Sequence, residues 1–462
     1  MANSSPFFQA LSDDILYIIF TYATPVSMTS STQINIRRMP PLNFSQVCRT
    51  WRFTVQAHPN LWTMISITYT IAEDDRSSNP IILPFVKKWL QRSPSTPIYC
   101  HLDLYGYEFR TDFVPLLDFL QSENHRWKDM DIGIRPHRIN IWNRDPIAIC
   151  CTPALSSFRL NRGGVFSNFR THPPVSLDLT SFAMDACSHL RVLDVSSGVK
   201  WLLPEKFSLP SLQELRICTD LGHDTTAILS ACPGISSLHI FVKDEALDHK
   251  VKSRVTVLSH LAFLEIRSSN DARSKHIINT LSCPSLQSLA FNESGELREI
   301  VALQSLRSIT AFLSRSNVHR SLVELRIQFY CIPTTNIDLD SRRENIWLMV
   351  DLLRSLANLE RLFLSGFIVD EDIVRLLTVH PKGLQEDFCK AAVCPLLREM
   401  MFTFTNLGRF GRGAMGAMIA SRWEATKKLR SVTLSFAEFP DFAHENERVR
   451  VCMEEGLILL AF

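Results

Sequence analysis

The sequence predicts an α/β fold in which a small N-terminal helical module precedes a long array of repeated strand and helix units. Apolar residues recur at helical spacing within the first sixty residues, and a short apolar phrase, L-x-x-L-x-L or a close variant, then recurs eleven times. Helical patterns fill the segments between the copies. A chain of 462 residues has room for roughly three ordinary domains or one long array.

Composition narrows the classes of function. Hydrophobic residues make up 46% of the chain and charged residues 21%, which excludes a largely disordered or collagen-like protein. The net charge is only +2, whereas a nucleic-acid or anionic-membrane binder usually carries a larger basic excess. We therefore expect a protein partner or a small ligand, with no nucleic acid and no membrane.

The cysteines and the N-terminus indicate an intracellular protein. The twelve cysteines form no C-x-x-C pair, so no zinc motif is present, and we expect reduced, mostly buried thiols without a metal. The N-terminus lacks the basic and apolar regions of a secretory signal, and no apolar stretch reaches the roughly 20 residues of a membrane helix. We expect a soluble protein of the cytoplasm, the nucleus or both.

Two helices are predicted in the N-terminal module. The first covers residues 11–22, where Ser12 is a plausible N-cap and Asp13 and Asp14 suit the positive helix end. The second lies in LNFSQVCRTWRFTVQAHPNLW, whose apolar residues recur at steps of three and four, and it ends near Pro59. A polar insert from Thr24 to Arg38 separates the helices.

The ordered set of residues in this module resembles the F-box, in the form common in fungal proteins. The resemblance covers about 50 residues and rests on Leu11, Asp14, Ile15, Leu16, Ile19, Phe20, Val47, Cys48, Arg49, Trp51, Arg52, Pro59, Leu61 and Trp62. Ser12 stands where the family usually has proline. The resemblance implies that a Skp-family adaptor is contacted by Leu11, Ser12, Ile15, Leu16, Ile19, Phe20, Val47, Cys48, Trp51, Leu61 and Trp62. The alternative is that these residues are only the core of a helical bundle, although so short a module cannot bury them all.

The repeated phrase predicts a parallel sheet. Its first apolar anchors are Trp127, Leu155, Leu190, Leu212, Ile235, Leu261, Leu286, Leu322, Leu359, Leu397 and Leu429, at steps of 22 to 38 residues. The shorter steps match leucine-rich repeats, and strand followed by helix implies an irregular solenoid with parallel inner strands and outer helices. We expect an F-box module over 1–62, a cap over 63–126 with one strand and two helices, and the solenoid over 127–462.

The turn before each strand is predicted to be the same structure in every repeat. Cysteines precede a first anchor by three residues at Cys187, Cys232, Cys283 and Cys394, and prolines precede one by two residues at five places. Thiols packed in the interior of each repeat explain this alignment better than cysteines that share a metal ion. Cys232 and Cys283 belong to strands about 10 Å apart, too far for one ion.

The residue between the two later anchors of each phrase should point away from the core, because side chains alternate along a strand. These positions hold Arg159, Asp194, Arg216, His239, Glu265, Ala290, Arg326, Phe363, Met401 and Thr433. We predict target binding through Arg159, Asp194, Arg216, His239, Glu265, Arg326, Phe363 and Met401, whose arginines could meet carboxylates or a phosphorylated segment. The alternative is that they are ordinary solvated residues.

One motif suggests other chemistry. Residues 411–416 match G-x-G-x-x-G between a strand-like and a helix-like segment, as in a phosphate cradle. Strand, loop and helix recur throughout this array, so the match is better explained by the repeat itself.

The resemblance therefore implies the substrate-recognition subunit of a Skp–cullin–F-box ubiquitin ligase, with the adaptor, through it a cullin, and an unknown target as partners. It implies no catalytic residue and no cofactor. The alternatives are a scaffold of the same F-box and repeat type acting outside a ligase and, less favoured, a nucleotide-binding enzyme.

Overall fold

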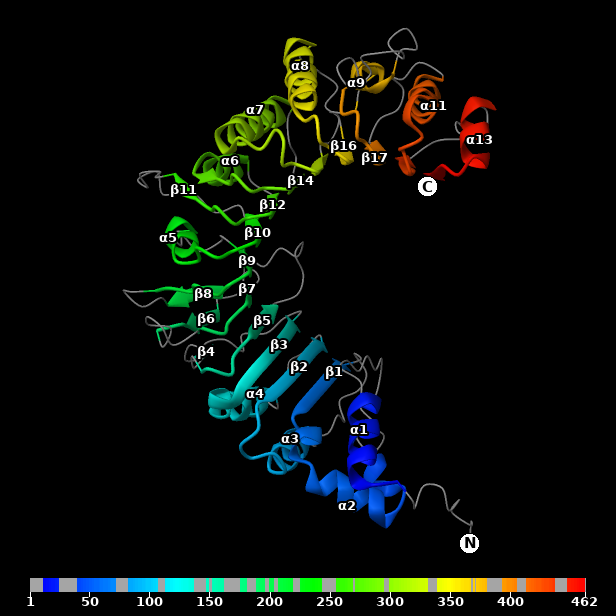
Figure 1. Cartoon of the computed structure of the whole chain (residues 1–462). Helices are drawn as coiled ribbons and strands as arrows, with labels where there is room; N and C mark the ends of the chain where they lie inside the picture. Colours follow the sequence, from blue (N-terminus) through cyan, green and yellow to red (C-terminus); the bar gives the residue numbers. More distant parts are fainter. Residues whose placement is uncertain are drawn as a thin grey trace. The chain divides into compact units, whose positions relative to one another are not determined.

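A computed structural model gives the structure of the chain. It describes residues 11–24, 40–71, 82–106, 113–136, 147–148, 152–161, 175–180, 188–195, 199–202, 207–218, 225–242, 255–268, 271–294, 299–330, 339–366, 369, 371–379, 393–404, 413–436 and 447–461. The chain forms two compact units, Met1–His223 and Asp224–Phe462. The colours of Figure 1 follow the chain through both units.

The first unit begins with the helical module. It contains α1 (Asp13–Ala23), α2 (Arg49–Ala57) and the short 3₁₀ helices η3 (Phe44–Gln46) and η4 (Pro59–Trp62). Ser12 caps α1 as predicted, its hydroxyl accepting from the N–H of Ile15 at 3.5 Å. The Phe20 ring stacks on Phe44 with centroids 4.7 Å apart and meets Trp51 edge-on at 4.9 Å. This aromatic cluster joins the two helices in one small core.

A parallel sheet follows in the same unit. Its strands, in spatial order, are β1 (Met64–Ile71), β2 (Ile98–Gly106), β3 (Trp127–Pro136), β5 (Ser157–Asn161), β7 (Val192–Val195) and β9 (Glu214–Cys218). Helix α3 (Ile82–Leu90) follows β1, and α4 (Phe113–Ser122) with η5 (Asn124–Arg126) follows β2. The region expected to form a cap thus contributes two strands to the sheet, one of which, β1, was not predicted.

The outer layer of this unit differs from the expected row of helices. After β3, the described connecting segments contain β4 (Ile147–Ala148), β6 (Val175–Asp178) and β8 (Val199–Leu202), which pair in parallel as a second small sheet. These segments are rich in polar and β-branched residues and lack the three- and four-residue apolar spacing of an amphipathic helix. In the described part of this stretch, short strands therefore stand where the sequence predicts outer helices.

Among its described residues, the second unit has eight parallel strands of the same kind. They are β10 (Ser237–Val242), β12 (Phe263–Ser268), β14 (Ser288–Ser294), β15 (Glu324–Tyr330), β16 (Arg361–Ser365), β17 (Glu399–Phe404), β18 (Ser431–Phe436) and β19 (Ile458–Ala461). Two-residue strands β11 (Thr256–Val257) and β13 (Leu281–Ser282) pair separately.

Helices connect most strands of the second unit. They are α5 (Thr225–Ser230), α6 (Asp271–Asn279), α7 (Glu299–Ser316), α8 (Leu339–Ser355), α9 (Glu371–Leu377), α11 (Ala414–Thr426) and α13 (Glu447–Glu454). Helices α6, α7, α8, α9, α11 and α13 each contact the next in that order, and Figure 1 shows α6, α7 and α8 side by side along the strands. The chain is thus an α/β protein with a large parallel sheet. None of its described helices is long and apolar enough to cross a membrane.

The repeated phrase forms the core, as predicted. All eleven first anchors are buried, and the two later anchors of each phrase are buried beside them. In the second unit the later anchors align across the strands, with Leu238 opposite Leu264, Leu264 opposite Leu289 and Leu289 opposite Leu325. Burying one such leucine contributes about 1.5 to 3 kcal/mol, so these stacked rows dominate the stability of the sheet.

The predicted turn before the strand has the same backbone hydrogen bond in seven repeats, whereas the N–H of Leu322 donates to the carbonyl four residues earlier. The N–H of a first anchor donates to the carbonyl three residues earlier at Leu155, Leu212, Ile235, Leu261, Leu286, Leu359 and Leu397. Cys232, Cys283 and Cys394 supply the accepting carbonyl in three of these turns. The same bond in repeats with different side chains shows that the backbone turn, and not a shared ligand, sets this spacing.

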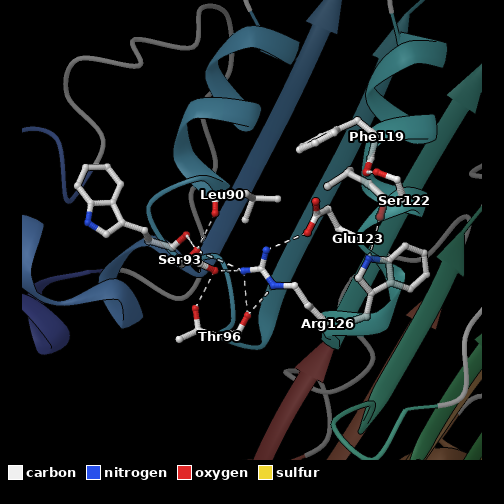
Figure 2. Close-up of polar contacts among 10 residues, drawn as sticks. Leu90, Ser93, Thr96, Phe119, Ser122, Glu123 and Arg126 are labelled. Carbon is white, nitrogen blue, oxygen red and sulfur yellow. Dashed lines mark hydrogen bonds and ion pairs between the residues drawn. The ribbon is translucent and has the colours of Figure 1, made fainter.

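Three arginines, of which Arg126 and Arg422 are buried, tie neighbouring connections together, a feature that the sequence did not reveal. Arg126 donates to the carbonyls of Ser93 and Thr96 and pairs with Glu123 at 2.8 Å (Figure 2). Arg315 at the end of α7 donates to the carbonyls of Ile278 and Leu281 at 2.7 and 2.9 Å. Arg422 in α11 likewise donates to the carbonyls of Leu377, Val393 and Cys394. Each guanidinium satisfies carbonyls at the end of an earlier helix or turn.

Candidate protein-binding surfaces

Helix α1 carries apolar side chains on two of its faces. Leu16 and Phe20 are fully buried against the rest of the module. Ile15, Ile18, Ile19 and Tyr22 are exposed, and their spacing of three, four and seven residues places them on one stripe of the helix. A helix at the surface of a self-contained bundle would carry polar residues there, so this α1 stripe is a candidate binding surface.

The same module exposes two further apolar side chains. Val47, just before α2, is 60% exposed, and Phe53 in α2 is 67% exposed. The exposed N-cap residue Cys48 lies between them in sequence, its sulfur accepting from the N–H of Trp51 at 3.5 Å. Both helices of the module therefore present apolar surface to solvent.

The structure divides the predicted adaptor residues into two groups. Ser12, Ile15, Ile19, Val47 and Cys48 are exposed, and Leu11 and Trp51 are half-buried. Leu16, Phe20, Leu61 and Trp62 are buried, so they can act only by shaping the surface. Ile18, Tyr22 and Phe53 are exposed although the expected set omits them.

Trp62 has the position of a first anchor in the sheet. In Trp62-x-x-Ile65-x-Ile67 and Trp127-x-x-Met130-x-Ile132 the spacing is identical and every one of these side chains is buried. The indole N–H of Trp62 donates to the carbonyl of Val55 at 2.9 Å, and that of Trp127 donates to the carbonyl of Leu120 at 3.1 Å, in both cases seven residues earlier. Trp62 therefore belongs to the core that joins the module to β1.

The residues between the anchors form one line across the sheet of the first unit. The line runs through Ser66, His101, Asp131, Arg159, Asp194 and Arg216, each opposite the next. From His101 onward acidic residues alternate with basic ones or histidine. The charges along this line thus alternate in sign, and the line starts earlier than expected from the sequence, because His101 and Asp131 also belong to it.

The charges on this line are paired within the chain. His101 Nδ1 lies 3.1 Å from Asp131, and Arg159 lies 3.5 Å from Asp129. Arg216 lies 2.7 Å from Glu214 and 3.9 Å from Asp194. A partner that binds these arginines through carboxylates or phosphates would have to compete with the chain's own acids.

Two groups on this line have shifted pKa values. Burial raises the pKa of Asp194 to about 6, although Arg216 and Arg159 oppose the shift. The hydrogen bond to Asp131 raises the pKa of His101. Asp194 therefore takes up a proton at higher pH than an exposed aspartate, and His101 keeps its proton to higher pH than an exposed histidine.

The second unit has a corresponding line on its sheet. It passes through His239, Glu265, Ala290, Arg326, Phe363, Met401, Thr433 and Leu460. Its first part is charged and its later part is mainly apolar, as the sequence predicts. Phe363 and Met401 are half-buried, whereas Leu460 is exposed at the edge strand β19.

Glu265 is the centre of a hydrogen-bonded cluster at the polar end of this line. Its carboxylate lies 2.7 Å from His239 Nδ1 and accepts from Arg267 Nε at 2.6 Å and from Asn292 Nδ2 at 3.4 Å. Burial alone would raise its pKa, but the hydrogen bonds from His239 and Arg267 outweigh it and lower the pKa to about 2. Glu265 is therefore a fixed negative charge whose partners are already in place.

Arg326 joins the polar and apolar parts of the line. Its guanidinium lies over the Phe363 ring, 4.6 Å from the centroid, and 3.5 Å from Glu324. Glu324 also pairs with Arg361 at 2.9 Å. As in the first unit, the arginine proposed for target binding already has an acidic partner.

The remaining candidates for chemistry are the buried cysteines and the glycine-rich match. Cys232 and Cys283 are fully buried, and burial raises the pKa of each thiol to about 12. The described residues contain no group of three or more His, Cys, Asp or Glu arranged to hold a metal ion. Of the G-x-G-x-x-G match, Gly411 and Arg412 lie outside the described residues, while Gly413 precedes α11 with a φ of 86°.

Comparison with known proteins assigns no family to the chain. No model of a known protein family matches the sequence. No curated protein matches it either.

Proposed function

We propose that this chain is the substrate-recognition subunit of a Skp–cullin–F-box ubiquitin ligase. Residues 11–62 would act as the F-box and dock on a Skp-family adaptor, and the sheet faces would bind a target protein. The α1 stripe carries this proposal, because Ile15, Ile18, Ile19 and Tyr22 expose apolar surface on a module that already buries Leu16 and Phe20. Val47 and Phe53 add to the same kind of surface.

We also propose that the strands and helices wind as an irregular leucine-rich-repeat solenoid. The repeated turn, the parallel register and the stacked anchors support this finer description. In such a protein the row of residues between the anchors is the natural place to bind an extended partner.

The proposed mechanism requires no catalytic residue from this chain. The module would hold the complex through the adaptor, and the sheet faces would hold the target. Tethering raises the effective concentration of a target lysine near the ubiquitin-conjugating enzyme, which converts an encounter between molecules into one within a complex.

Assembly from purified components tests this function. The full chain, a Skp-family adaptor and a cullin should elute as one ternary complex in size-exclusion chromatography. The double variant Ile15→Asp/Ile19→Asp should lose both partners, because two charges enter the apolar contact. The control Val255→Asp/Val257→Asp, at exposed valines of the second unit, should keep both. Elution of the chain with the adaptor but without the cullin would indicate a scaffold outside the ligase.

A further inference from the structure

The sheet of the second unit has an incomplete hydrogen-bond network around Ala290. Ala290 is the smallest residue of its line, between Glu265 on one neighbouring strand and Arg326 on the other. Ser288 and Asn292 lie two residues to either side of it on β14 and therefore share its face of the sheet. These residues, with Arg326, are called the Ala290 cluster below.

Three polar atoms of this cluster have no partner among the described residues. They are Ser288 Oγ, Asn292 Oδ1 and Arg326 Nε. The Ser288 side chain is about nine-tenths buried, and Asn292 is held in place because its Nδ2 already donates to Glu265. Leaving a buried polar atom without a partner is unfavourable, so a group that supplies the missing bonds is bound favourably.

The charges of this face favour an uncharged group. Glu265 is satisfied by His239 and Arg267, and Glu324 is satisfied by Arg361 and Arg326. A carboxylate or phosphate would approach these acids, and a lysine would approach three arginines. Neither ion could use both kinds of free atom, since Asn292 Oδ1 only accepts and Arg326 Nε only donates.

A carboxamide meets both requirements. Its NH₂ group can donate to Asn292 Oδ1 or Ser288 Oγ while its carbonyl accepts from Arg326 Nε. In the free chain these three atoms are buried, so a ligand can reach them only if the side chains that cover them move. The Arg326 guanidinium lies over the Phe363 ring, so a movement of Arg326 toward the ligand would also uncover that ring for contact.

The distance between Ala290 and Phe363 determines how far apart the two recognised side chains of the ligand must be. Ala290 and Phe363 lie on β14 and β16, two strands apart, which corresponds to about 10 Å. A peptide in the polyproline II conformation advances about 3.1 Å per residue with three residues per turn, so a side chain three positions further along faces the same way and spans about this distance. Met401 on the next strand extends the apolar surface.

We propose that this face binds an extended target segment that places Gln or Asn at the Ala290 cluster and an apolar side chain, three residues away, on Phe363 and Met401. The proposal rests on the proposed function, because it defines the class of target. The test of this proposal needs no adaptor, so the peptide specificity and the proposed function can fail separately.

Selection from a phage-displayed random heptapeptide library on the immobilised full chain tests this specificity. The expected result is enrichment of sequences with Gln or Asn three residues from Leu, Met or Phe. A selected peptide should bind Asn292→Leu and Arg326→Met at least tenfold more weakly in fluorescence polarisation, since each variant removes one bond to the amide. Arg375→Met, at an exposed arginine of α9, is the matched control and should bind normally.

Several results would overturn the proposal. Enrichment of acidic sequences, or stronger binding of phosphopeptides, would assign the arginines to anion recognition. Failure to enrich any sequence would mean that ordered water alone completes the cluster. Equal binding by wild type, Asn292→Leu and Arg326→Met would place the peptide elsewhere. Circular dichroism melting of each variant separates lost binding from lost folding, and two independent variants keep the result decisive.

Discussion

Trp62 and Trp89 meet edge to face, with ring centroids 5.0 Å apart and ring planes inclined by 73°. Both side chains are buried, and Ser93 in the turn after α3 donates to the Trp62 carbonyl at 3.3 Å. The helical module and the first strands of the sheet therefore share a core. Removing residues 1–62 would take away part of the sheet's own core, so point variants are cleaner tests of the module than truncation.

Replacing Trp62 with alanine should destabilise the first unit by about 3 to 5 kcal/mol, because a large buried ring is lost and a cavity remains. Trp89→Ala should also destabilise it, and the double variant should lose less than the sum of the two. Denaturant unfolding of the three variants measures this coupling. Strictly additive losses would mean that the two rings do not support each other.

Arg126→Lys should destabilise the chain by about 1 to 3 kcal/mol. A lysine has one compact ammonium group and cannot bond to the carbonyls of Ser93 and Thr96 and to Glu123 with the same geometry. Denaturant unfolding checks this loss. Arg450→Lys, at an exposed arginine of α13, provides the control and should change stability by less than about 0.5 kcal/mol.

Cys232→Ser and Cys283→Ser should each destabilise by about 1 to 3 kcal/mol, because a hydroxyl enters an apolar layer. Cys48→Ser should be neutral or slightly stabilising, since serine is a better N-cap for α2. Thermal unfolding compares the three variants. Metal analysis of the purified chain should find no stoichiometric zinc, and one bound zinc per chain would contradict a purely structural role.

Asp194→Asn should stabilise the chain at neutral pH and have little effect near pH 4. The folded-state pKa of Asp194 is raised to about 6, so the charge that forms as pH rises from about 4 to above 6 is less favourable in the folded than in the unfolded chain. The expected gain at pH 7 is about 1 to 2 kcal/mol. Unfolding free energies measured from pH 4 to 8 test this sign, and a larger gain at pH 4 than at pH 7 would reverse it.

Much of the sheet is predictable because one rule repeats. Spacing of three and then two residues after a first anchor is enough to place Leu193 and Val195 in the core with Asp194 on the opposite face, and the strand register then aligns Asp194 with Arg159 and Arg216. The alternation of side chains along one strand is enough to predict which of them face the core, even where the neighbouring strands are not known.

Other features depend on contacts between distant residues. Trp62 fits both the repeated phrase and the end of the F-box-like pattern, and only its contact with Trp89, which is distant in sequence, places it in the core of the sheet. Ion pairs such as Arg159 with Asp129 depend on strand register and side-chain direction, which sequence spacing alone does not fix. On the exposed face of α1 the sequence pattern places Ile15 and Ile19 in the adaptor contact but omits Ile18, whose exposure depends on Leu16 and Phe20 filling the interior.

The most direct test of the account is the affinity of the full chain for a purified Skp-family adaptor, measured by calorimetry with two matched variants. Val47 and Val257 are 60% and 64% exposed, so Val47→Asp and Val257→Asp place the same charge at similarly exposed valines, one in the module and one on β11. The account predicts that Val47→Asp weakens adaptor binding at least tenfold, or about 1.4 kcal/mol, and that Val257→Asp leaves it unchanged. Equal affinities for the wild type and both variants, or no adaptor binding by the wild type, would contradict it.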